Sequence, residues 1–314
     1  MTPAIALVFP GQGSQSVGMG RVFYDAVPEV RKVYEEATTI LGYDIAELCF
    51  DGPSDRLNDT EYTQPALLTV SIAALRAFEP TGIRPMAVAG HSGGEYSALV
   101  AAGGLTFGTA VSLVQKRGRY MAEAVPSGRG LVAAVLGVSK EIVVEACREA
   151  ASIGIVAPAN FNCPGQIVIA GDKAAVERAI ELMKAKGCRK AIPLPVSVPV
   201  HTPLMQRAAD RLTHDVDRAL WSDLKMPLIN NAEAKPVRLA ADLKASVIRQ
   251  LPSPVLWEES IKVMQGMGVK TFIEIGSGTV LTGLVKRIAP DATTLNVHDP
   301  ASLEATVKML TVNR

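Results

Sequence analysis

The run Gly90-His-Ser-Gly-Gly94 places a serine where it could act as a nucleophile. A short apolar segment, Met86 to Ala89, leads into it, and a helical pattern follows directly. This is the strand–turn–helix pattern Gly-x-Ser-x-Gly, in which a strained turn lifts the serine hydroxyl above a sheet edge. Side chains at Gly90 or Gly94 would collide with the neighbouring strand and helix. We predict that Ser92 is a nucleophile; the alternative is a serine that only caps a helix.

A nucleophilic serine needs a base at neutral pH, and the ordinary pKa of histidine suits that role. His201 lies in the proline-bracketed turn Val198-Pro-Val-His-Thr-Pro203 and is the predicted base, with a buried structural histidine as the alternative. His91 adjoins the serine, so its side chain should point away from the hydroxyl. His214 lies in a charged amphipathic helix and His298 near the C-terminus. The group that orients the imidazole stays open between a backbone carbonyl and an acid after His201.

Two further features fit acyl chemistry. An oxyanion needs two amides aimed at one point, and we expect them from Gly93 and from the loop Gly11-Gln12-Gly13. A plain glycine turn is the alternative for Gln12. Arg117 lies in the helical segment Leu113–Met121, and a guanidinium that reached a cleft would present a planar fork to a carboxylate. The residues alone favour an ordinary surface arginine at this position.

Composition restricts the function classes. The 314 residues are 48% apolar and 20% charged, which is enough for a sizeable core. A net charge of +1 argues against a bulk basic surface for nucleic acid or anionic membrane. No apolar run reaches the roughly 18 residues of a membrane helix, and the start lacks a cationic leader. The four dispersed cysteines suggest neither a zinc site nor a disulfide framework. We expect a cytoplasmic, metal-free enzyme.

Apolar strand-like runs alternate with helical patterns, which predicts an α/β fold with a parallel sheet. The expected strands of this body are Ile5–Phe9, Pro227–Asn230, Thr271–Ile275 and Thr294–Val297. Its expected helices are Gln64–Phe78, Thr106–Ala124 with Thr106 as the N-cap, and Leu303–Leu310.

The stretch from residue 128 to 196 follows a different order. Its expected elements are the strand Leu131–Val138, the helix Lys140–Ala151, the strand pair Gly154–Asn162 and Gln166–Gly171, the helix Lys173–Lys186 and the strand Arg189–Pro195. This β-α-β-β-α-β order is the ferredoxin-like arrangement. We therefore predict a hydrolase-like parallel-sheet body, residues 1–127 and 197–314, with an inserted ferredoxin-like α+β subdomain over 128–196. A cleft between the two is where ligands would bind.

Seven motifs occur in an order that resembles one family from end to end. They are Phe9-Pro-Gly-Gln-Gly-Ser-Gln15, Tyr62-Thr-Gln-Pro-Ala-Leu67, Gly90-His-Ser-Gly-Gly-Glu-Tyr96, Arg117-Gly118, Asn160-Phe-Asn-Cys-Pro-Gly-Gln-Ile-Val-Ile-Ala-Gly171, Val198-Pro-Val-His201 and Glu274-Ile-Gly-Ser-Gly278. The chain resembles the malonyl-CoA:acyl carrier protein transacylases, both the discrete enzymes of bacterial fatty acid synthesis and the acyltransferase domains of polyketide synthases.

The resemblance implies a ping-pong transfer in which Ser92 accepts a malonyl group from malonyl-CoA and passes it to the phosphopantetheine thiol of an acyl carrier protein. It implies that Arg117 pairs with the malonyl carboxylate and that the main-chain carbonyl of Gln250 orients His201. Gln12 and the amide of Gly93 would form the oxyanion hole, and Gln64 and Asn162 match positions that line the family's pocket. The implied cofactor set is empty, because the coenzyme A thioester enters as substrate.

Four cations are candidate contacts for the acidic carrier protein, with ordinary solvated charges as the alternative: Arg189, Lys190, Lys286 and Arg287. We expect a monomer. The motifs leave the pathway, fatty acid or polyketide, and the cognate carrier protein open.

Two departures from the family pattern leave acyl selectivity open. The family commonly has a bulkier residue where this chain has Gly93, and serine or phenylalanine where it has Val200. Either change could admit a substituted malonyl group. A thioesterase that shares Ser92 and His201 is a rival function, and retention of Arg117 favours transfer. A non-enzymatic carrier-docking module is a second rival, against which the Ser92 and His201 pair argues.

Overall fold

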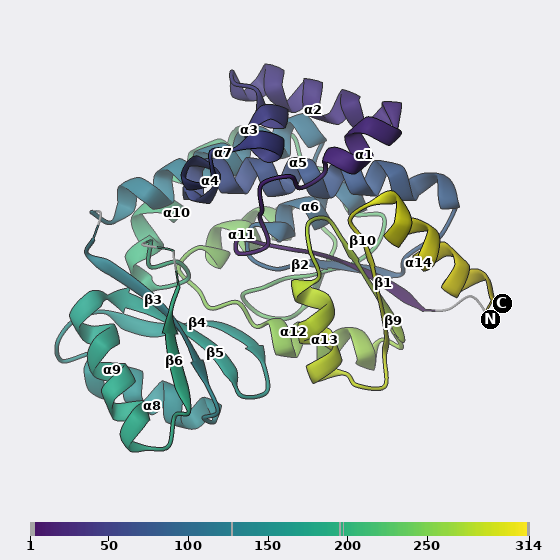
Figure 1. Ribbon diagram of the computed structural model, residues 1–314. Coiled ribbons are helices and arrows are strands. Elements are labelled where there is room, and N and C mark those ends of the chain that lie inside the picture. The colour runs from purple at the N-terminus through teal and green to yellow at the C-terminus, as the bar shows by residue number, and fades with distance from the viewer. Residues whose placement is uncertain (1–3, 127, 195, 197, 313–314) are drawn as a thin grey trace.

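The computed structural model describes residues 4–126, 128–194, 196 and 198–312 and contains two sheets (Figure 1). The larger sheet has the strand order β10-β9-β1-β2-β7-β8. Its strands are β1 (Ile5–Phe9), β2 (Ala87–Gly90), β7 (Leu228–Ile229), β8 (Pro236–Val237), β9 (Thr271–Ile275) and β10 (Thr293–Val297). All pairings are parallel except that of β8 with β7.

The central strands β1 and β2 are buried along their whole length. Such unbroken apolar runs are typical of parallel strands that helices cover on both faces. On one face Leu7 and Val88 pack into the larger core with α5 (Thr60–Phe78) and α7 (Phe107–Ala124). On the other face Ala6 and Val8 pack against α12 (Trp257–Gly266) and α13 (Val280–Ile288). The ends of β1 and β2 lie side by side, with Phe9 opposite Gly90. The loops after these strands therefore meet at one sheet edge.

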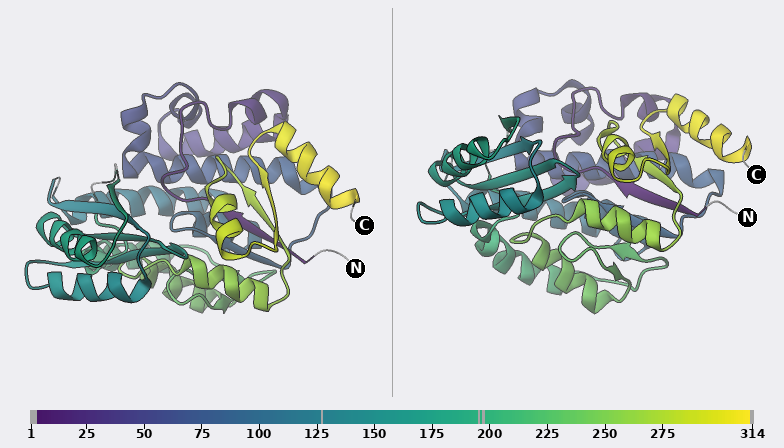
Figure 2. Two further views of the ribbon diagram at one scale, coloured as in Figure 1. Left: turned by 60° about the horizontal axis from the view of Figure 1, so that its bottom comes forward. Right: turned by 90° about the horizontal axis from the view of Figure 1, so that it is seen from below.

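The helices of the body follow in chain order. They are α1 (Arg21–Ala26), α2 (Pro28–Leu41), α3 (Ile45–Asp51), α4 (Ser54–Asn58), α5 (Thr60–Phe78), α6 (Gly94–Ala102), α7 (Phe107–Ala124), α10 (Gln206–Arg218), α11 (Ala240–Gln250), α12 (Trp257–Gly266), α13 (Val280–Ile288) and α14 (Pro300–Val312), with 3₁₀ turns η1 (Glu79–Thr81) and η2 (Pro203–Met205). The start of β1 lies near the end of α14 (Figure 2).

The smaller sheet has the order β4-β5-β3-β6 and is antiparallel throughout. It comprises β3 (Gly130–Leu136), β4 (Val156–Cys163), β5 (Gln166–Asp172) and β6 (Lys190–Pro193), with α8 (Lys140–Ala150) and α9 (Lys173–Ala185). The two helices cover one face with a core of their own, and the opposite face carries a small apolar cluster. The predicted fold class, a parallel-sheet body with a ferredoxin-like insert, is confirmed.

The insert is joined to the body by backbone hydrogen bonds as well as by the chain. The amide of Phe161 in β4 donates to the carbonyl of Val255 at 2.9 Å, and the amide of Val255 donates to that of Ala159 at 2.9 Å. The predicted domain boundaries remain a prediction, because Ser127 and Ser197 lie outside the described residues.

Most predicted elements are present, with small shifts at their ends. Thr106 caps α7 as predicted, since its hydroxyl accepts from the amide of Thr109 at 3.2 Å. The helix predicted from Gln64 begins earlier, at Thr60, because the Asp59 carboxylate caps it. The last strand of the insert is shorter than predicted and ends at Pro193, while Pro195 lies outside the described residues. Within the described chain, no helix combines the length and apolarity that a membrane crossing requires.

Candidate active site

The turn between β2 and α6 holds Ser92 in a left-handed backbone conformation, with φ at 52°. The flanking glycines allow this turn to pack tightly, as predicted. A Cβ on Gly90 would lie 2.0 Å from the backbone of Gly94, and one on Gly94 would lie 2.3 Å from the carbonyl oxygen of Phe9. Any other residue at these two positions would push β1, β2 and α6 apart. The serine side chain is thus raised at the carboxyl edge of the sheet.

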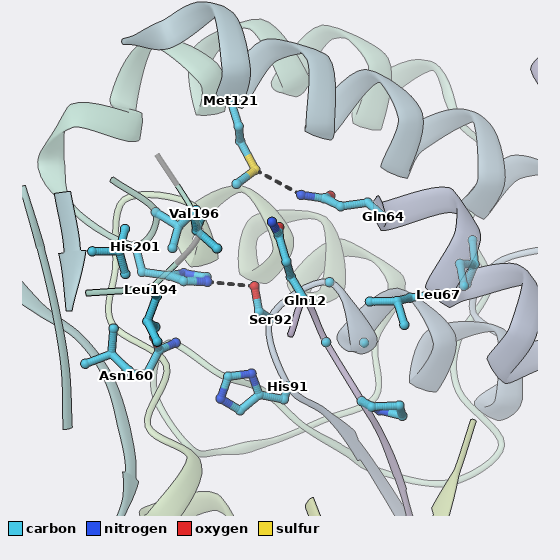
Figure 3. A pocket seen from close by; sticks show the side chains of 18 of the residues that line it. Gln12, Gln64, Leu67, His91, Ser92, Met121, Asn160, Leu194, Val196 and His201 are labelled. Atoms are coloured by element: carbon cyan, nitrogen blue, oxygen red, sulfur yellow. Dashed lines mark hydrogen bonds between the residues drawn. The ribbon is translucent and has the colours of Figure 1, made fainter. Parts of the chain in front are cut away.

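His201 lies next to this serine although the two are distant in sequence. The Ser92 hydroxyl and His201 Nε2 are 2.7 Å apart (Figure 3). His201 Nδ1 faces two carbonyl oxygens, that of Gln250 at 3.0 Å and that of Ser253 at 3.2 Å. Carbonyl oxygens only accept, so Nδ1 carries the proton and Nε2 is free to accept from the serine hydroxyl.

The environment of His201 keeps its ring neutral. The side chain is buried, and burial lowers the pKa of His201 to about 3, with the positive charge of Arg117 acting in the same direction. The two carbonyl contacts oppose this shift without reversing it. A neutral imidazole with a free Nε2 is the form that can accept a proton.

Two backbone amides are available beside the serine. The amides of Gln12 and Gly93 donate no hydrogen bond to any described part of the chain. The loop that carries Gln12 lies against the serine turn, because a Cβ on Gly11 would lie 2.2 Å from the carbonyl oxygen of His91. The side-chain amide of Gln12 donates to the Thr60 hydroxyl at 3.2 Å. Both amides therefore belong to segments that meet at Ser92.

Sequence reasoning did not identify Asn231, which follows β7 at the same sheet edge. Its side-chain oxygen accepts from the amide of Ser92 at 2.7 Å, and its Nδ2 donates to the carbonyl of Gly90 at 2.7 Å. Its own amide donates to the buried carboxyl of Glu95 at 2.9 Å. These contacts fix the strained turn from both sides. The signal that the sequence offered for Asn231 was a pair of polar residues, Asn230 and Asn231, directly after a buried strand.

Arg117 is buried, with 1% of its surface exposed, so the interpretation of a surface arginine is wrong. Its Nη1 donates to Gln64 Oε1 and its Nη2 to Gln250 Oε1, each at 2.8 Å. Within the described chain it forms no ion pair, and its Nε has no hydrogen-bond acceptor. A Cβ built on Gly93 would come within 4.0 Å of Nη1, which places the guanidinium close behind the serine turn.

A cavity opens in front of Ser92, and its walls come from both the body and the insert. The body contributes Gln12, Gln64, Leu67, His91, Met121, Val200 and His201, and the insert contributes Val132, Asn160, Val168 and Leu194. Most of this lining is apolar. The predicted cleft between the two parts of the chain is therefore present, with Ser92 among the residues that line it (Figure 3).

One prediction about the lining needs correction. Asn162 is not among the lining residues. Its side-chain oxygen lies 2.8 Å from His91 Nε2, so it supports His91 from behind, and Asn160 faces the cavity instead. His91 points away from the serine hydroxyl as expected, yet it also lines the cavity. Burial lowers its pKa, which keeps this ring neutral.

The four candidate cations are exposed and lie near one end of the smaller sheet. Lys190 in β6 pairs with Leu136 at the end of β3. The residue after Leu136 is Gly137, whose amide donates to the carbonyl of Gly165 in the β4–β5 turn at 3.0 Å. Arg287 donates to the Pro164 carbonyl of this turn at 2.9 Å and to Gln166 Oε1 at 2.5 Å. Arg287 thus already joins α13 to the insert, whereas Lys286 makes no ion pair within the described chain.

No cluster of three or more potential metal ligands occurs among the described residues. The arrangement at the sheet edge is a serine, a neutral histidine that can accept its proton, two free amides and a buried guanidinium. It can form and break an ester on Ser92.

Comparisons with known proteins agree with this chemistry. The model of the acyl transferase domain family matches residues 6–301. The malonyl CoA-acyl carrier protein transacylase of Salmonella typhimurium is 46% identical to this chain, over 96% of the chain and 97% of that protein. The Bacillus subtilis transacylase is 47% identical, over 98% of the chain and 97% of that protein.

Solved structures match as closely. The malonyl CoA-acyl carrier protein transacylase of Coxiella burnetii superposes with a TM-score of 0.97 at 42% identity, covering 99% of each chain. A malonyl-transacylase in complex with the acyl-carrier protein of a type II PKS gives a TM-score of 0.95 at 44% identity, covering 98% of this chain and 99% of that one.

Proposed function

This chain belongs to the acyl transferase domain family, and we propose that it transfers a malonyl group from malonyl-CoA to the phosphopantetheine thiol of an acyl carrier protein. The observation that carries this function is the contact between Ser92 and a neutral His201 beside a buried arginine that has no ionic partner in the described chain. Malonyl-CoA is the donor and the carrier protein the acceptor. The transfer supplies extender units for fatty acid or polyketide synthesis.

In the first half-reaction, His201 Nε2 takes the proton of the Ser92 hydroxyl as Oγ attacks the thioester carbonyl carbon. The amides of Gly93 and Gln12 donate to the resulting oxyanion, a contact worth about 3–4 kcal/mol per donor in known sites. Collapse breaks the carbon–sulfur bond, and the coenzyme A sulfur leaves with the proton from Nε2. The Gln250 carbonyl holds Nδ1 throughout, so the ring does not turn away.

The second half-reaction reverses these roles with a new thiol. His201 Nε2 accepts the proton of the phosphopantetheine thiol, and the sulfur attacks the ester carbonyl on Ser92. The Ser92 oxygen then leaves and recovers its proton from Nε2. One histidine can serve both halves because it begins and ends each one neutral.

Arg117 supports selection of a dicarboxylic acyl group. A buried cation without a direct ion pair is unfavourable, and a malonyl carboxylate would supply that ion pair. Gln64 and Gln250 hold the guanidinium through neutral oxygens and leave its charge uncompensated by a direct ion pair. An acyl group without a carboxylate would leave the charge as it was, so it would gain nothing from this contact.

The test follows both products of purified protein mixed with malonyl-CoA and a phosphopantetheinylated carrier protein. We expect malonyl-carrier to form faster than free malonate, and a Ser92→Ala variant to form neither above background. Free malonate as the main product with carrier present would make the protein a thioesterase instead.

One observation favours a second candidate, transfer of a substituted malonyl group. Gly93 has no side chain, and a Cβ there would meet only Arg117 Nη1, at 4.0 Å. That space could hold a methyl substituent. A Gly93→Leu variant should then lose methylmalonyl transfer by about tenfold relative to malonyl transfer in a competition of the two thioesters. An unchanged ratio would exclude Gly93 from acyl selection.

The four exposed cations Arg189, Lys190, Lys286 and Arg287 are the proposed contacts for the acidic carrier protein, and their position near one end of the insert supports a single docking face. The expectations of a cytoplasmic location, of a monomer and of a protein without a cofactor stay predictions.

A further inference from the structure

Two buried charges lie on opposite sides of one amide group beside the nucleophile. Arg117 Nη2 donates to Gln250 Oε1 at 2.8 Å, and Gln250 Nε2 donates to Glu95 Oε2 at 3.0 Å. The exposed fractions of Arg117 and Glu95 are 1% and 0%. Gln250 Nε2 also donates to the carbonyl of Ser92 at 3.1 Å. The amide therefore connects the cation, the carboxyl group and the serine turn.

Glu95 forms no direct ion pair within the described chain, and the charge of Arg117 acts on it across the Gln250 amide. Its Oε2 accepts from Gln250 and from the amide of Asn231, while its Oε1 has no partner in the described chain. Burial raises the pKa of Glu95 to about 7, against the opposing effects of these contacts, of the Arg117 charge and of the Ser246 hydroxyl on α11. Tyr96 on α6 also faces this pair, and burial raises its pKa, so that it stays neutral.

We propose that Glu95 is the internal counter-ion of Arg117 and that its ionisation sets how strongly the site binds an acyl carboxylate. This inference rests on the proposed role of Arg117. A malonyl carboxylate on the guanidinium would share that cation with the Glu95 carboxylate across the Gln250 amide. Binding is weaker while Glu95 is ionised and stronger once it is protonated. By linkage, a bound malonyl group favours proton uptake by Glu95.

The ionisation of Glu95 can be followed by pH titration because the other titratable groups of the described site do not change their charge near neutrality. Burial lowers the pKa of His201 to about 3 and that of His91 below its usual value, so both rings stay neutral. Between about pH 5.5 and 8.5, any change in the charge of the described site therefore comes from the titration of Glu95. Acidification across this window should strengthen malonyl binding without removing the base.

The first experiment compares the wild type with Glu95→Gln. Glutamine keeps an oxygen that can accept from Asn231 and Gln250 but carries no charge. We expect the wild-type KM for malonyl-CoA to fall by about 3- to 30-fold from pH 8.5 to 5.5. The variant should show the low KM over the whole range, with the pH change in kcat the same in both proteins. A variant that keeps the wild-type pH dependence of KM overturns the proposal.

Glu274→Gln is the matched control. Glu274 is also buried, but its two oxygens accept from the amides of Leu281 and Thr282 at the start of α13, away from the cavity lining. The KM of Glu274→Gln for malonyl-CoA should show the same pH dependence as that of the wild type. This dependence includes any contribution from titration of the coenzyme A phosphates. A shift like that of Glu95→Gln would mean that loss of any buried carboxyl has this effect, and would overturn the proposal.

Proton uptake by the wild-type protein tests the same claim without a variant. Malonylation of Ser92 near pH 7 should take up a fraction of a proton, and acetylation from acetyl-CoA should not. Equal values for the two thioesters would overturn the inference. An Arg117→Ala variant that keeps its malonyl preference would instead overturn the proposed role of Arg117, on which this inference rests, so the two failures are distinguishable.

Discussion

Ser92 and His201 both have left-handed backbone conformations, with φ at 52° and 59°. Such conformations cost a non-glycine residue of the order of 1–3 kcal/mol, so the surroundings must hold them. Asn231 does so for the serine, with contacts on both sides of the turn. The carbonyls of Gln250 and Ser253 hold the histidine ring. Strain at both partners of one hydrogen bond supports a functional reason for their geometry.

At the residue scale, Arg117→Ala tests carboxylate recognition. We expect this variant to lose about 100-fold in its preference for malonyl-CoA over acetyl-CoA, because the cation that distinguishes them is gone. The ratio of the two Ser92 adducts in a competition measures this. Arg119→Ala is the matched control, since Arg119 lies on the same helix, is exposed and pairs only loosely with Glu123, at 3.9 Å. An unchanged ratio in Arg117→Ala would refute the role.

At the element scale, three segments meet at one sheet edge: the loop after β1, the turn after β2 and the Asn230-Asn231 pair after β7. The parallel order of the strands brings these loops together although they are far apart in sequence. The glycines allow the contact. Substitution of these glycines should disturb the packing between the loops and strands before it affects the reaction at Ser92.

Gly94→Ala tests this junction. The new Cβ would lie 2.3 Å from the Phe9 carbonyl oxygen and 2.7 Å from that of Pro10, so the backbone of the β1 loop must shift. We expect a loss of about 1–3 kcal/mol in the free energy of unfolding. Urea unfolding curves measure the change.

Gly266→Ala in α12 is the control for Gly94→Ala. A Cβ there meets nothing within 4 Å, and alanine is the better helix former, so this variant should gain up to about 1 kcal/mol. Equal stability changes in the two variants would contradict the close approach at Gly94.

The elements and the serine turn could be predicted because their signals are local. Apolar runs and the glycine pattern around Ser92 depend on residues a few positions apart. The contact of Asn231 with Ser92 spans 139 positions, so no local pattern contains it. Glu95 offered a weak signal, as the one charged residue in the apolar helix Gly94–Ala102. Asn160 and Asn162 are two apart in β4, so strand periodicity places both on one face and does not tell which one lines the cavity.

At the scale of the whole molecule, the cavity lies between two parts of the chain with separate cores. The body supplies Ser92 and His201, the proposed nucleophile and base, and the insert supplies an apolar wall. Arg287 joins α13 to the β4–β5 turn of the insert, which leaves Lys286 as the freer cation of this face for a carrier protein.

Lys286→Glu tests the docking face. Reversal of an exposed charge should raise the KM for the carrier protein severalfold and leave that for malonyl-CoA unchanged, because the residue is remote from the cavity lining. The difference should shrink as salt is added. Lys308→Glu is the control, an exposed lysine on α14, a helix that lies away from the insert in Figure 1. Equal effects of the two reversals would show that only net charge matters.

The central claim is that Ser92 carries the malonyl group between the two thiols. Its most direct test is intact-protein mass spectrometry after brief mixing with malonyl-CoA, followed by addition of carrier protein. We predict one malonyl adduct that maps to Ser92, is absent in Ser92→Ala and disappears as malonyl-carrier forms. An adduct that persists in Ser92→Ala, or malonyl-carrier that forms at the wild-type rate without Ser92, would contradict the account.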